Sequence, residues 1–508
     1  MLARVGTITF IGIEVKKIDI QVHIAPGGLP CFNIVGLADK SIAESKERVR
    51  AAFTSIGLGF PPKRITVNLA PADVLKEGSH FDLGIAVGLL VAMQIIPQEE
   101  IDNYLFMGEL ALDGNITGVN GVLPAAIKAQ GLNMGLVCPK HNGSEAVWAG
   151  NKSIVAPTNL LELINHCTGK QYLSSPKHLS ISEELNYPDF KDVKGQKVAK
   201  KALEIAAAGQ HNMIMIGPPG AGKSMLAKRL PGILPALSIE EKLEISIIAS
   251  ITGLLNSSSP IVQHRPFRDP HCSSSMPAMV GGGRNAKPGE ITLAHLGVLF
   301  LDELPEFSRS VLESLRQPIE AGSISIARVN THITYPAKFQ LIAAMNPCRC
   351  GYYGSKYELM CHRAPRCAEE YQSRVSGPLL DRFDLQVEVI AENVLQLYNT
   401  TYVEESSSDI LKRVANARNI QQKRYEAFEL PITLNSELDG GMLKKVITLN
   451  ARARQLLEEA AEKFSLSMRG FNRVLKVART IADLGGNADV TEFDIAQALN
   501  YRISKINK

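Results

Sequence analysis

The chain of 508 residues lacks several features that would assign it to particular classes of protein. It has no apolar run long enough to cross a bilayer, and Met1–Phe10 lacks the basic region and long apolar core of a secretory signal. Its eight cysteines are too few and too scattered for a disulfide framework. Its net charge is only +4, so any site for a polyanion must be local. These absences predict a cytoplasmic protein that does not span a membrane.

Residues 217–224 read GPPGAGKS, between the apolar run Met213–Ile216 and a helix-like stretch. A buried strand, a glycine-rich turn and a helix N-terminus, in that order, cradle a phosphate group with backbone N–H groups and the helix dipole. Lys223 is expected to reach the β- and γ-phosphates, and Ser224 to hold Mg²⁺. The predicted nucleotide-binding residues of the loop are Gly217, Pro218, Pro219, Gly220, Ala221, Gly222, Lys223, Ser224 and Met225. The alternative is a glycine-rich turn that matches by chance.

Two further apolar strands end in the polar side chains that ATP hydrolysis requires. Residues 298–303 read VLFLDE, so Asp302 is expected to hold Mg²⁺ and Glu303 to orient or deprotonate the attacking water. The strand Phe339–Met345 precedes Asn346, which can hydrogen-bond the water or the γ-phosphate without adding negative charge. Each segment alone fits an ordinary core strand or turn. Their order behind the phosphate loop predicts a hydrolytic site.

Hydrophobic periodicity divides the chain into three parts and a linker. Residues 1–168 alternate β-rich runs with helical ones, which is typical of an α/β or α+β domain. Residues 169–188 indicate an exposed linker. From 189 to 390, strands alternate with helices as in a parallel sheet, and 391–508 is mostly helical. The expected elements are strands at 18–24, 64–69 and 136–138 and helices at 41–56, 82–93, 411–427, 451–464 and 472–484.

Several long segments together resemble the magnesium-chelatase-like AAA+ ATPases. They are DFKDVKGQ (189–196), the phosphate loop, RPFRDPHCSSS (265–275), the stretch 281–307 and SGPLLDRFD (376–384). The resemblance covers nearly the whole chain, and it implies a hexameric ring with ATP at each subunit interface. It further implies a role in DNA branch migration during recombination in natural transformation.

The same resemblance implies roles for residues outside the loop. Val193 would contact the nucleotide. Arg382, in the LLDRFD segment, matches the arginine finger that a neighbouring subunit inserts toward the γ-phosphate, where its planar guanidinium spreads charge over several oxygens. Arg469 resembles the second sensor arginine, with Arg473 as the alternative. Each of these arginines, without the resemblance, would be read as a surface residue.

Two segments around the core are candidates for contact with DNA. The first, 263–288, carries Arg265, Arg268, Arg284 and Lys287 against one acidic residue, Asp269. The second, 323–337, alternates as a hairpin that includes Arg328, Asn330 and His332. In related ring motors such hairpins face the pore, where contacts with phosphates carry no sequence information. An ordinary solvated hairpin fits the second segment as well.

Four cysteines follow Asn346 closely: Cys348, Cys350, Cys361 and Cys367. Thiolates at these separations can enclose a tetrahedral Zn²⁺. The family commonly has a second tight C-x-C pair here, whereas this chain has Arg363 where the later cysteine would fall. The fourth ligand is therefore open between Cys367 and His362. Four free thiols are the alternative to zinc.

The first domain resembles the Lon protease fold in residues 76–88 and 114–129. Lon-type peptidases need a serine nucleophile and a lysine base. Here His80 occupies the serine position and Ala125 the lysine position, with Ser79 and Lys128 nearby but out of register. The resemblance therefore implies a scaffold without protease activity, which helps to form the ring or to guide DNA.

The leading hypothesis is a hexameric DNA helicase that hydrolyses ATP with Mg²⁺, with Zn²⁺ as a further cofactor and recombination proteins as further partners. The alternative is a magnesium-chelatase-type ATPase subunit that remodels a partner for metal insertion. The Lon-like first domain favours the motor, because dedicated chelatase motor subunits lack such a domain. A nucleotide-dependent assembly protein is a third reading, and the presence of Glu303 and Arg382 argues against it.

Overall fold

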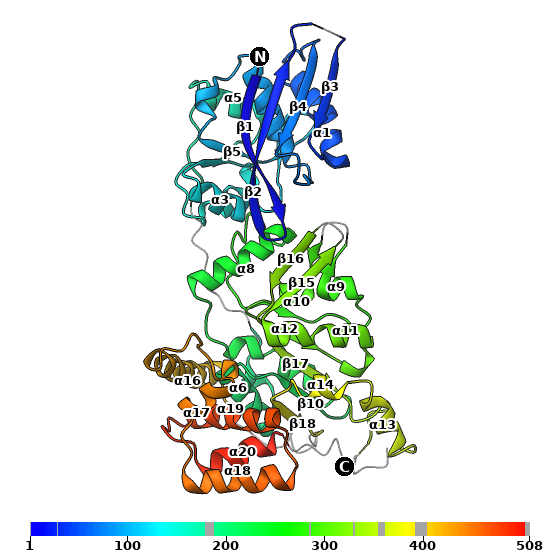
Figure 1. Ribbon diagram of the computed structural model, residues 1–508, viewed down its shortest axis with the longest axis vertical. Coiled ribbons are helices and arrows are strands. Elements are labelled where there is room, and N and C mark those ends of the chain that lie inside the picture. Colours follow the sequence, from blue (N-terminus) through cyan, green and yellow to red (C-terminus); the bar gives the residue numbers. More distant parts are fainter. Residues whose placement is uncertain are drawn as a thin grey trace. The chain divides into compact units, whose positions relative to one another are not determined.

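The computed structural model describes residues 2–27, 29–177, 187–283, 286–328, 331–353, 361–391 and 404–502. They belong to two compact units, one of residues 1–183 and 238–263 and the other of residues 184–237 and 264–508 (Figure 1). Among the described residues, no helix is long and apolar enough to cross a membrane. The mixed α/β architecture with a parallel central sheet and a helical C-terminal region confirms the predicted fold class.

The first unit is built on a seven-stranded sheet of order β3-β4-β2-β1-β5-β8-β9. Its strands β1, β2 and β4 pair antiparallel, and the outer pairs β3–β4, β1–β5, β5–β8 and β8–β9 are parallel. The bounds are β1 Leu2–Ile11, β2 Glu14–Ile24, β3 Cys31–Val35, β4 Arg64–Ala70, β5 Tyr104–Phe106, β8 Gly135–Val137 and β9 Ile154–Val155. A small hairpin of β6 (Glu109–Leu110) and β7 (Ile116–Thr117) lies outside this sheet.

Helix α2 (Phe81–Ala92) is buried along its whole length against the sheet. Gly84 and Gly88 lie one turn apart on it, and a Cβ at either would come within 2.6 Å of a side-chain carbon of Ile20 or Val22. The two glycines therefore let the helix approach β2 closely. The other helices of the unit are α1 (Lys40–Ser55), α3 (Val122–Gly131), α4 (Gly143–Val147), α5 (Leu160–Cys167) and α8 (Ile239–Thr252), with short 3₁₀ turns at Gln98–Glu100 and Lys140–Asn142.

Helix α8 corrects the domain division drawn from the sequence, which assigned residues 238–263 to the ATPase core. The structure places them in the first unit. The buried Ser250 hydroxyl donates to Glu145, which also accepts the N–H of Leu123, and the Ser250 carbonyl accepts the N–H of Gly121 at 3.1 Å. The chain thus leaves the second unit at residue 237 and returns to it at residue 264. It does so because α8 packs against α3 and α4 of the first unit and forms its buried hydrogen bonds there.

The second unit contains a five-stranded parallel sheet of order β11-β14-β17-β10-β18. The strands are β10 Met213–Ile216, β11 Phe267–Arg268, β14 Val298–Leu301, β17 Gln340–Met345 and β18 Leu385–Glu388. Every residue of β10, β14 and β17 is buried, as expected of a parallel sheet covered on both faces. In this order β17 lies between β14 and β10, so the carboxyl ends of three strands meet at one edge.

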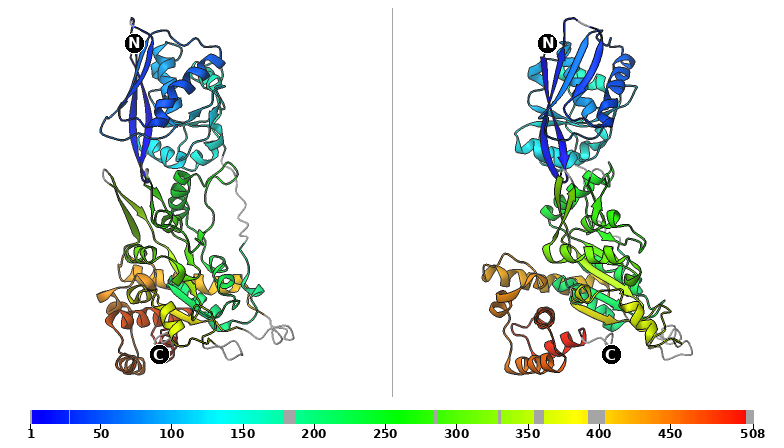
Figure 2. Two further views of the ribbon diagram at one scale, coloured as in Figure 1. Left: turned by 90° about the vertical axis from the view of Figure 1, so that its right-hand side faces the viewer. Right: turned by 45° about the vertical axis from the view of Figure 1, so that its right-hand side comes forward.

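Helices and two small hairpins surround this sheet. The helices before the C-terminal region are α6 (Lys197–Gly209), α7 (Lys223–Ala227), α9 (Met276–Val280), α10 (Glu290–Leu293), α11 (Arg309–Ser314), α12 (Arg316–Ala321), α13 (Arg366–Gln372) and α14 (Gly377–Leu380). The hairpins are β12–β13 (Gly281–Gly282 and Lys287–Pro288) and β15–β16 (Ser323–Arg328 and Thr331–Pro336). The second hairpin lies in the segment for which a hairpin was predicted, and it projects as a ribbon in Figure 2.

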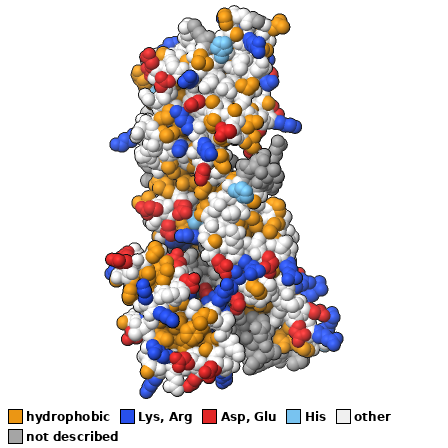
Figure 3. Space-filling model, in the orientation of Figure 1, with side chains coloured by type: hydrophobic (Ala, Val, Ile, Leu, Met, Phe, Trp, Pro, Cys, Tyr) orange, Lys and Arg blue, Asp and Glu red, His pale blue; other side chains and the backbone are white. Residues whose placement is uncertain are grey.

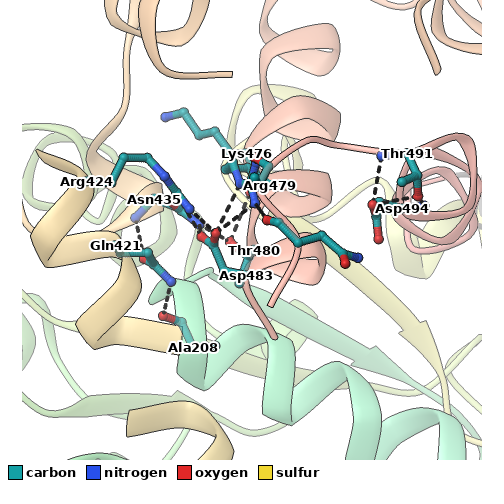
Figure 4. A network of polar contacts seen from close by, with 12 residues as sticks. Ala208, Gln421, Arg424, Asn435, Lys476, Arg479, Thr480, Asp483, Thr491 and Asp494 are labelled. Atoms are coloured by element: carbon teal, nitrogen blue, oxygen red, sulfur yellow. Dashed lines mark hydrogen bonds and ion pairs between the residues drawn. The ribbon is translucent and has the colours of Figure 1, made fainter. Parts of the chain in front are cut away.

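The C-terminal helices gather at one end of the second unit (Figures 1 and 2). They are α16 (Ser407–Ala427), α17 (Gly440–Val446), α18 (Ala451–Lys463), α19 (Met468–Leu484) and α20 (Glu492–Asn500). A buried polar network ties α16 and α19 to each other and to α6 (Figure 4). In it Asp483 accepts from Arg424, Arg479 and Asn435, and Gln421 donates to the carbonyl of Ala208 at 3.1 Å.

Candidate functional site

The phosphate loop connects the end of β10 to the start of α7. Gly220 and Gly222 have φ angles of +78° and +88°, in the left-handed region that glycine adopts without strain. A Cβ on Gly217 would stand 2.1 Å from the carbonyl oxygen of Val389, which follows β18. The N–H of Gly217 donates to the carbonyl of Met345 at 3.2 Å. The loop is therefore held between the ends of β17 and β18, with no space for a side chain at Gly217, while Gly220 and Gly222 supply the left-handed backbone.

Lys223 lies on the inner side of this loop, with only 8% of its surface exposed. Its ammonium group donates to the carbonyls of Gly217 and Pro218 at 2.7 and 2.9 Å and to Asn346 Oδ1 at 3.1 Å. Burial lowers the pKa of Lys223, while the charges of Asp302 and Glu303 act in the opposite direction. The ammonium is thus placed where a phosphate group bound in the loop would meet a cation, and Asn346 lies beside it.

Ser224 and Asp302 form the second part of the site. The Ser224 hydroxyl donates to Asp302 Oδ2 at 2.5 Å, so two oxygen ligands of the kind that Mg²⁺ prefers lie side by side. The other Asp302 oxygen accepts the N–H of Glu303 at 2.9 Å. Glu303 is exposed and has a φ of +52°, a left-handed conformation that is strained for a residue with a side chain. Such strain at the end of β14 is typical of a functional position.

The predicted arginines lie at the opposite edge of the sheet. Arg382, Arg469 and Arg473 line one pocket of about 680 Å³ with Lys338, Asp384 and Lys476. Asn212, Phe339 and Asp384, which directly precede β10, β17 and β18, also line it. On the face drawn in Figure 3, Lys and Arg side chains gather near the level of α12. A four-residue strand is about 13 Å long, so this pocket is separated from the phosphate loop of the same chain by the full length of the strands.

Within the pocket Arg382 is only 6% exposed and already has partners. It donates to Glu320 Oε1 and to the carbonyl of Pro378, each at 2.6 Å, while its buried Nε has no partner among the described residues. Arg473 pairs with Asp384 at 3.4 Å, and burial lowers its pKa. Arg469 is exposed. Glu320 was not among the predicted residues, and nothing in its local sequence marks it as the partner of Arg382.

The candidate DNA-contacting residues divide into two groups. Arg265 donates to the carbonyls of Pro235 and Leu296, and Arg268 forms a two-point ion pair with Glu290. These two guanidinium groups are therefore engaged inside the second unit. Lys287 and His332 are exposed. Arg284 and Asn330 lie outside the described residues, as does the side chain of Arg328.

Val193 and His80, two further residues singled out in the sequence, are both buried in the structure. Val193 is 2% exposed and packs in the main core of the second unit, and its contact with the nucleotide stays a prediction. In the first unit His80 is buried and its Nε2 lies 3.0 Å from the carbonyl oxygen of Ile8. Ser79 donates to Glu109. The side chains at the Lon-like nucleophile position thus serve local packing and hydrogen bonding.

The four cysteines after Asn346 come together in the structure. Their sulfur atoms all lie within 4.8 Å of one another, and none forms a disulfide. The fourth member of this cysteine cluster is Cys367, whereas His362 does not belong to it. Backbone N–H groups of Gly351, Tyr352 and Tyr353 hydrogen-bond to the Cys348 sulfur, and those of Arg349 and Cys350 to the Cys367 sulfur. This donor set fits a tetrahedral thiolate site for a metal ion.

A phosphate loop follows one strand of the sheet. Its serine hydrogen-bonds to an aspartate at the end of the strand two places away, and a polar sensor residue follows the strand between them. This arrangement defines a P-loop ATPase of the AAA+ class. Comparison with known proteins agrees. Residues 20–142, 189–397 and 404–502 match three parts of one family, described as subunit ChlI of Mg-chelatase, magnesium chelatase subunit ChlI, and the C-terminal part of that subunit.

Similarity to individual proteins extends over nearly the full length. The chain is 42% identical over 508 residues to the competence protein ComM of Haemophilus influenzae, covering 99% of this chain and 97% of that protein. It is 41% identical over 507 residues to YifB of Escherichia coli, with the same coverage. The magnesium-chelatase 67 kDa subunit of Heliobacterium mobile is 25% identical over 261 residues, covering 45% of this chain and 37% of that subunit. The chain belongs to the magnesium-chelatase-like AAA+ ATPase family, together with ComM and YifB.

Proposed function

We propose that the protein is an ATP-dependent DNA helicase that works as a homo-hexameric ring and promotes branch migration of DNA junctions during recombination in the cytoplasm. Its proposed cofactors are ATP and Mg²⁺ at the phosphate loop and Zn²⁺ at the cysteine cluster. Recombination proteins are its proposed further partners. The near full-length similarity to a protein named for competence supports this proposal over other roles for an AAA+ ATPase.

The observation that carries the proposal is the division of the site between two edges of one sheet. Lys223, Ser224 and Asp302 meet at the carboxyl ends of the strands, while Arg382 lines a pocket at the amino ends. Because one chain cannot bring both sets to one phosphate, hydrolysis requires a second copy that supplies the arginine. A repeated head-to-tail contact of this kind closes into a ring.

In this proposal each residue has a definite task. Lys223 neutralises the β- and γ-phosphates, Ser224 and Asp302 hold Mg²⁺, and Asn346 and Glu303 position and activate the water. Arg382 of the adjacent copy stabilises the charge that develops on the transferred phosphoryl group, with Arg469 or Arg473 beside it. The exposed Lys287 and His332 near the hairpins are the described candidates for contact with DNA phosphates.

A magnesium-chelatase-type subunit that remodels a partner for metal insertion is the second candidate. The similarity to the Heliobacterium mobile subunit supports it, but that similarity spans only 45% of the chain. A direct test uses labelled three- and four-way DNA junctions with the purified protein, ATP and Mg²⁺. We expect branch migration that Lys223→Ala and Glu303→Gln abolish. Hydrolysis of ATP without junction movement at any salt concentration would refute the helicase function.

A further inference from the structure

The cysteine cluster lies next to the nucleotide site, and its geometry suits a metal. A tetrahedral Zn²⁺ with Zn–S bonds of about 2.3 Å requires sulfur atoms about 3.8 Å apart. The four sulfurs lie within 4.8 Å of one another, so small side-chain rotations reach that arrangement. Cys348 is buried, which protects one side of such a site from water.

We propose that Cys348, Cys350, Cys361 and Cys367 bind one Zn²⁺, and that the zinc-bound segment positions Asn346 and the phosphate loop for ATP hydrolysis. The coupling to hydrolysis rests on the proposed function of the site as an ATPase. The binding of the metal itself does not depend on that proposed function.

The first link from the cluster to the site runs along the chain. Asn346 directly follows β17, and Cys348 comes two residues later. After Cys350, Gly351 turns with a φ of +87° and packs so tightly on the phosphate loop that a Cβ would lie 2.5 Å from Cδ of Pro219. The turn that directly follows the first two metal ligands thus touches the loop that holds the phosphates. A metal that fixes this turn also fixes the wall of the loop.

The second link runs through helix α13, which carries Cys367. Tyr371, one helical turn after Cys367, is 4% exposed, and its hydroxyl accepts the backbone N–H of Asn346. The next residue, Gln372, donates to the carbonyl of Pro347 at 2.8 Å. The Asn346–Pro347 backbone is therefore held by α13, and α13 is held in turn by its cysteine.

These two links converge on the hydrogen bond of 3.1 Å between Lys223 Nζ and Asn346 Oδ1. Without the metal, residues 347–353 and α13 keep their own hydrogen bonds and packing but lose the link through the four cysteines that joins them. Asn346 would then lose its fixed orientation toward the attacking water, although Lys223 and the rest of the loop stay in place. We therefore expect the metal to act on turnover more than on nucleotide affinity.

The first experiment measures the metal. The purified full-length protein should contain one zinc per chain by elemental analysis, and Cys348→Ser/Cys367→Ser should contain nearly none. Cys31→Ser, which replaces a cysteine of the first unit outside the cluster, serves as the control and should keep the full content. A zinc content near zero in the unmodified protein, or iron in place of zinc, would overturn the assignment.

The second experiment measures the coupling. Removing zinc with a thiol-modifying mercurial and a chelator, followed by reduction, should lower kcat for ATP hydrolysis about tenfold, and added Zn²⁺ should restore it. Tyr371→Phe, which keeps all four ligands, should retain zinc and lower kcat about fivefold with little change in KM. Equal kcat in the zinc-free and zinc-loaded protein would overturn the coupling. Because no DNA is present, failure of the helicase function would not affect either result.

Discussion

A mixture of two inactive variants tests whether each ATP site is divided between neighbouring subunits. Lys223→Ala removes the ammonium from a subunit's own loop, whereas Arg382→Ala removes the arginine that it offers to the next subunit. Each variant alone should form rings without a complete site, and an arginine finger is worth about 10³–10⁵ in rate. In mixed rings, a site is complete where an Arg382→Ala subunit supplies the loop and a Lys223→Ala subunit supplies the arginine.

The size of the recovery follows from counting interfaces. When the variants are mixed equally and assort at random, each head-to-tail interface has about one chance in four of combining an intact loop with an intact arginine. ATP hydrolysis measured after co-expression or subunit exchange should therefore reach about a quarter of the unmodified rate, provided that each site hydrolyses ATP independently of the others.

The control is a mixture of Lys223→Ala with Glu303→Gln. Both residues belong to the same edge of the same chain, so no arrangement of these subunits completes a site, and no recovery is expected. Recovery equal to that of the first mixture, or none in either mixture despite proven mixed rings, would refute the division of the site inferred from the sheet.

Three further predictions concern stability, pH and DNA. Asp483→Ala leaves Arg424 and the fully buried Arg479 without their shared carboxylate, so denaturant titration should show a loss of about 3–5 kcal/mol in the unfolding free energy, against almost none for the exposed Asp489→Ala. Burial lowers the pKa of His80 to about 4 from 6.5, so the unfolded chain binds the extra proton as the pH falls through that range. The first unit should then lose up to about 3 kcal/mol between pH 6.5 and 4, and His80→Gln should remove this dependence in melts followed across pH. Lys287→Ala should weaken DNA binding uniformly across sequences and reduce the slope of log affinity against log salt by about one, as measured by fluorescence anisotropy.

The nucleotide site was largely predictable because its parts follow short, strongly patterned strands. The apolar runs before Gly217, Asp302 and Asn346 are β10, β14 and β17, and their ends meet as parallel pairing requires. The helices expected at 451–464 and 472–484 correspond to α18 and α19, because their apolar spacing matches the buried side. Local pattern was sufficient where an element is buried throughout, as in these three strands, or along one side, as in α18 and α19.

Long-range partners were not predictable from such patterns. The pairing of Arg382 with Glu320 joins residues 62 positions apart, and the contact of Gly351 with Pro219 joins two loops. The placement of residues 238–263 in the first unit depends on the contact of Ser250 with Glu145 across 105 positions. In each case the partner is chosen by the packing of whole elements, which leaves no periodic trace in the sequence.

The Arg382–Glu320 pair also bears on how a ring would be switched on. Arg382 is almost fully buried, while the Glu320 side chain is 55% exposed and therefore free to meet solvent when released. For Arg382 to reach a neighbour's γ-phosphate in the proposed ring, it must exchange this carboxylate for phosphate oxygens. That exchange replaces one charge-assisted bond by others of similar kind, so its cost is low only when a nucleotide is present on the adjoining subunit. Glu320→Gln should accordingly raise the ATPase rate at low nucleotide concentration, and an unchanged rate would show that the pair does not restrain the arginine.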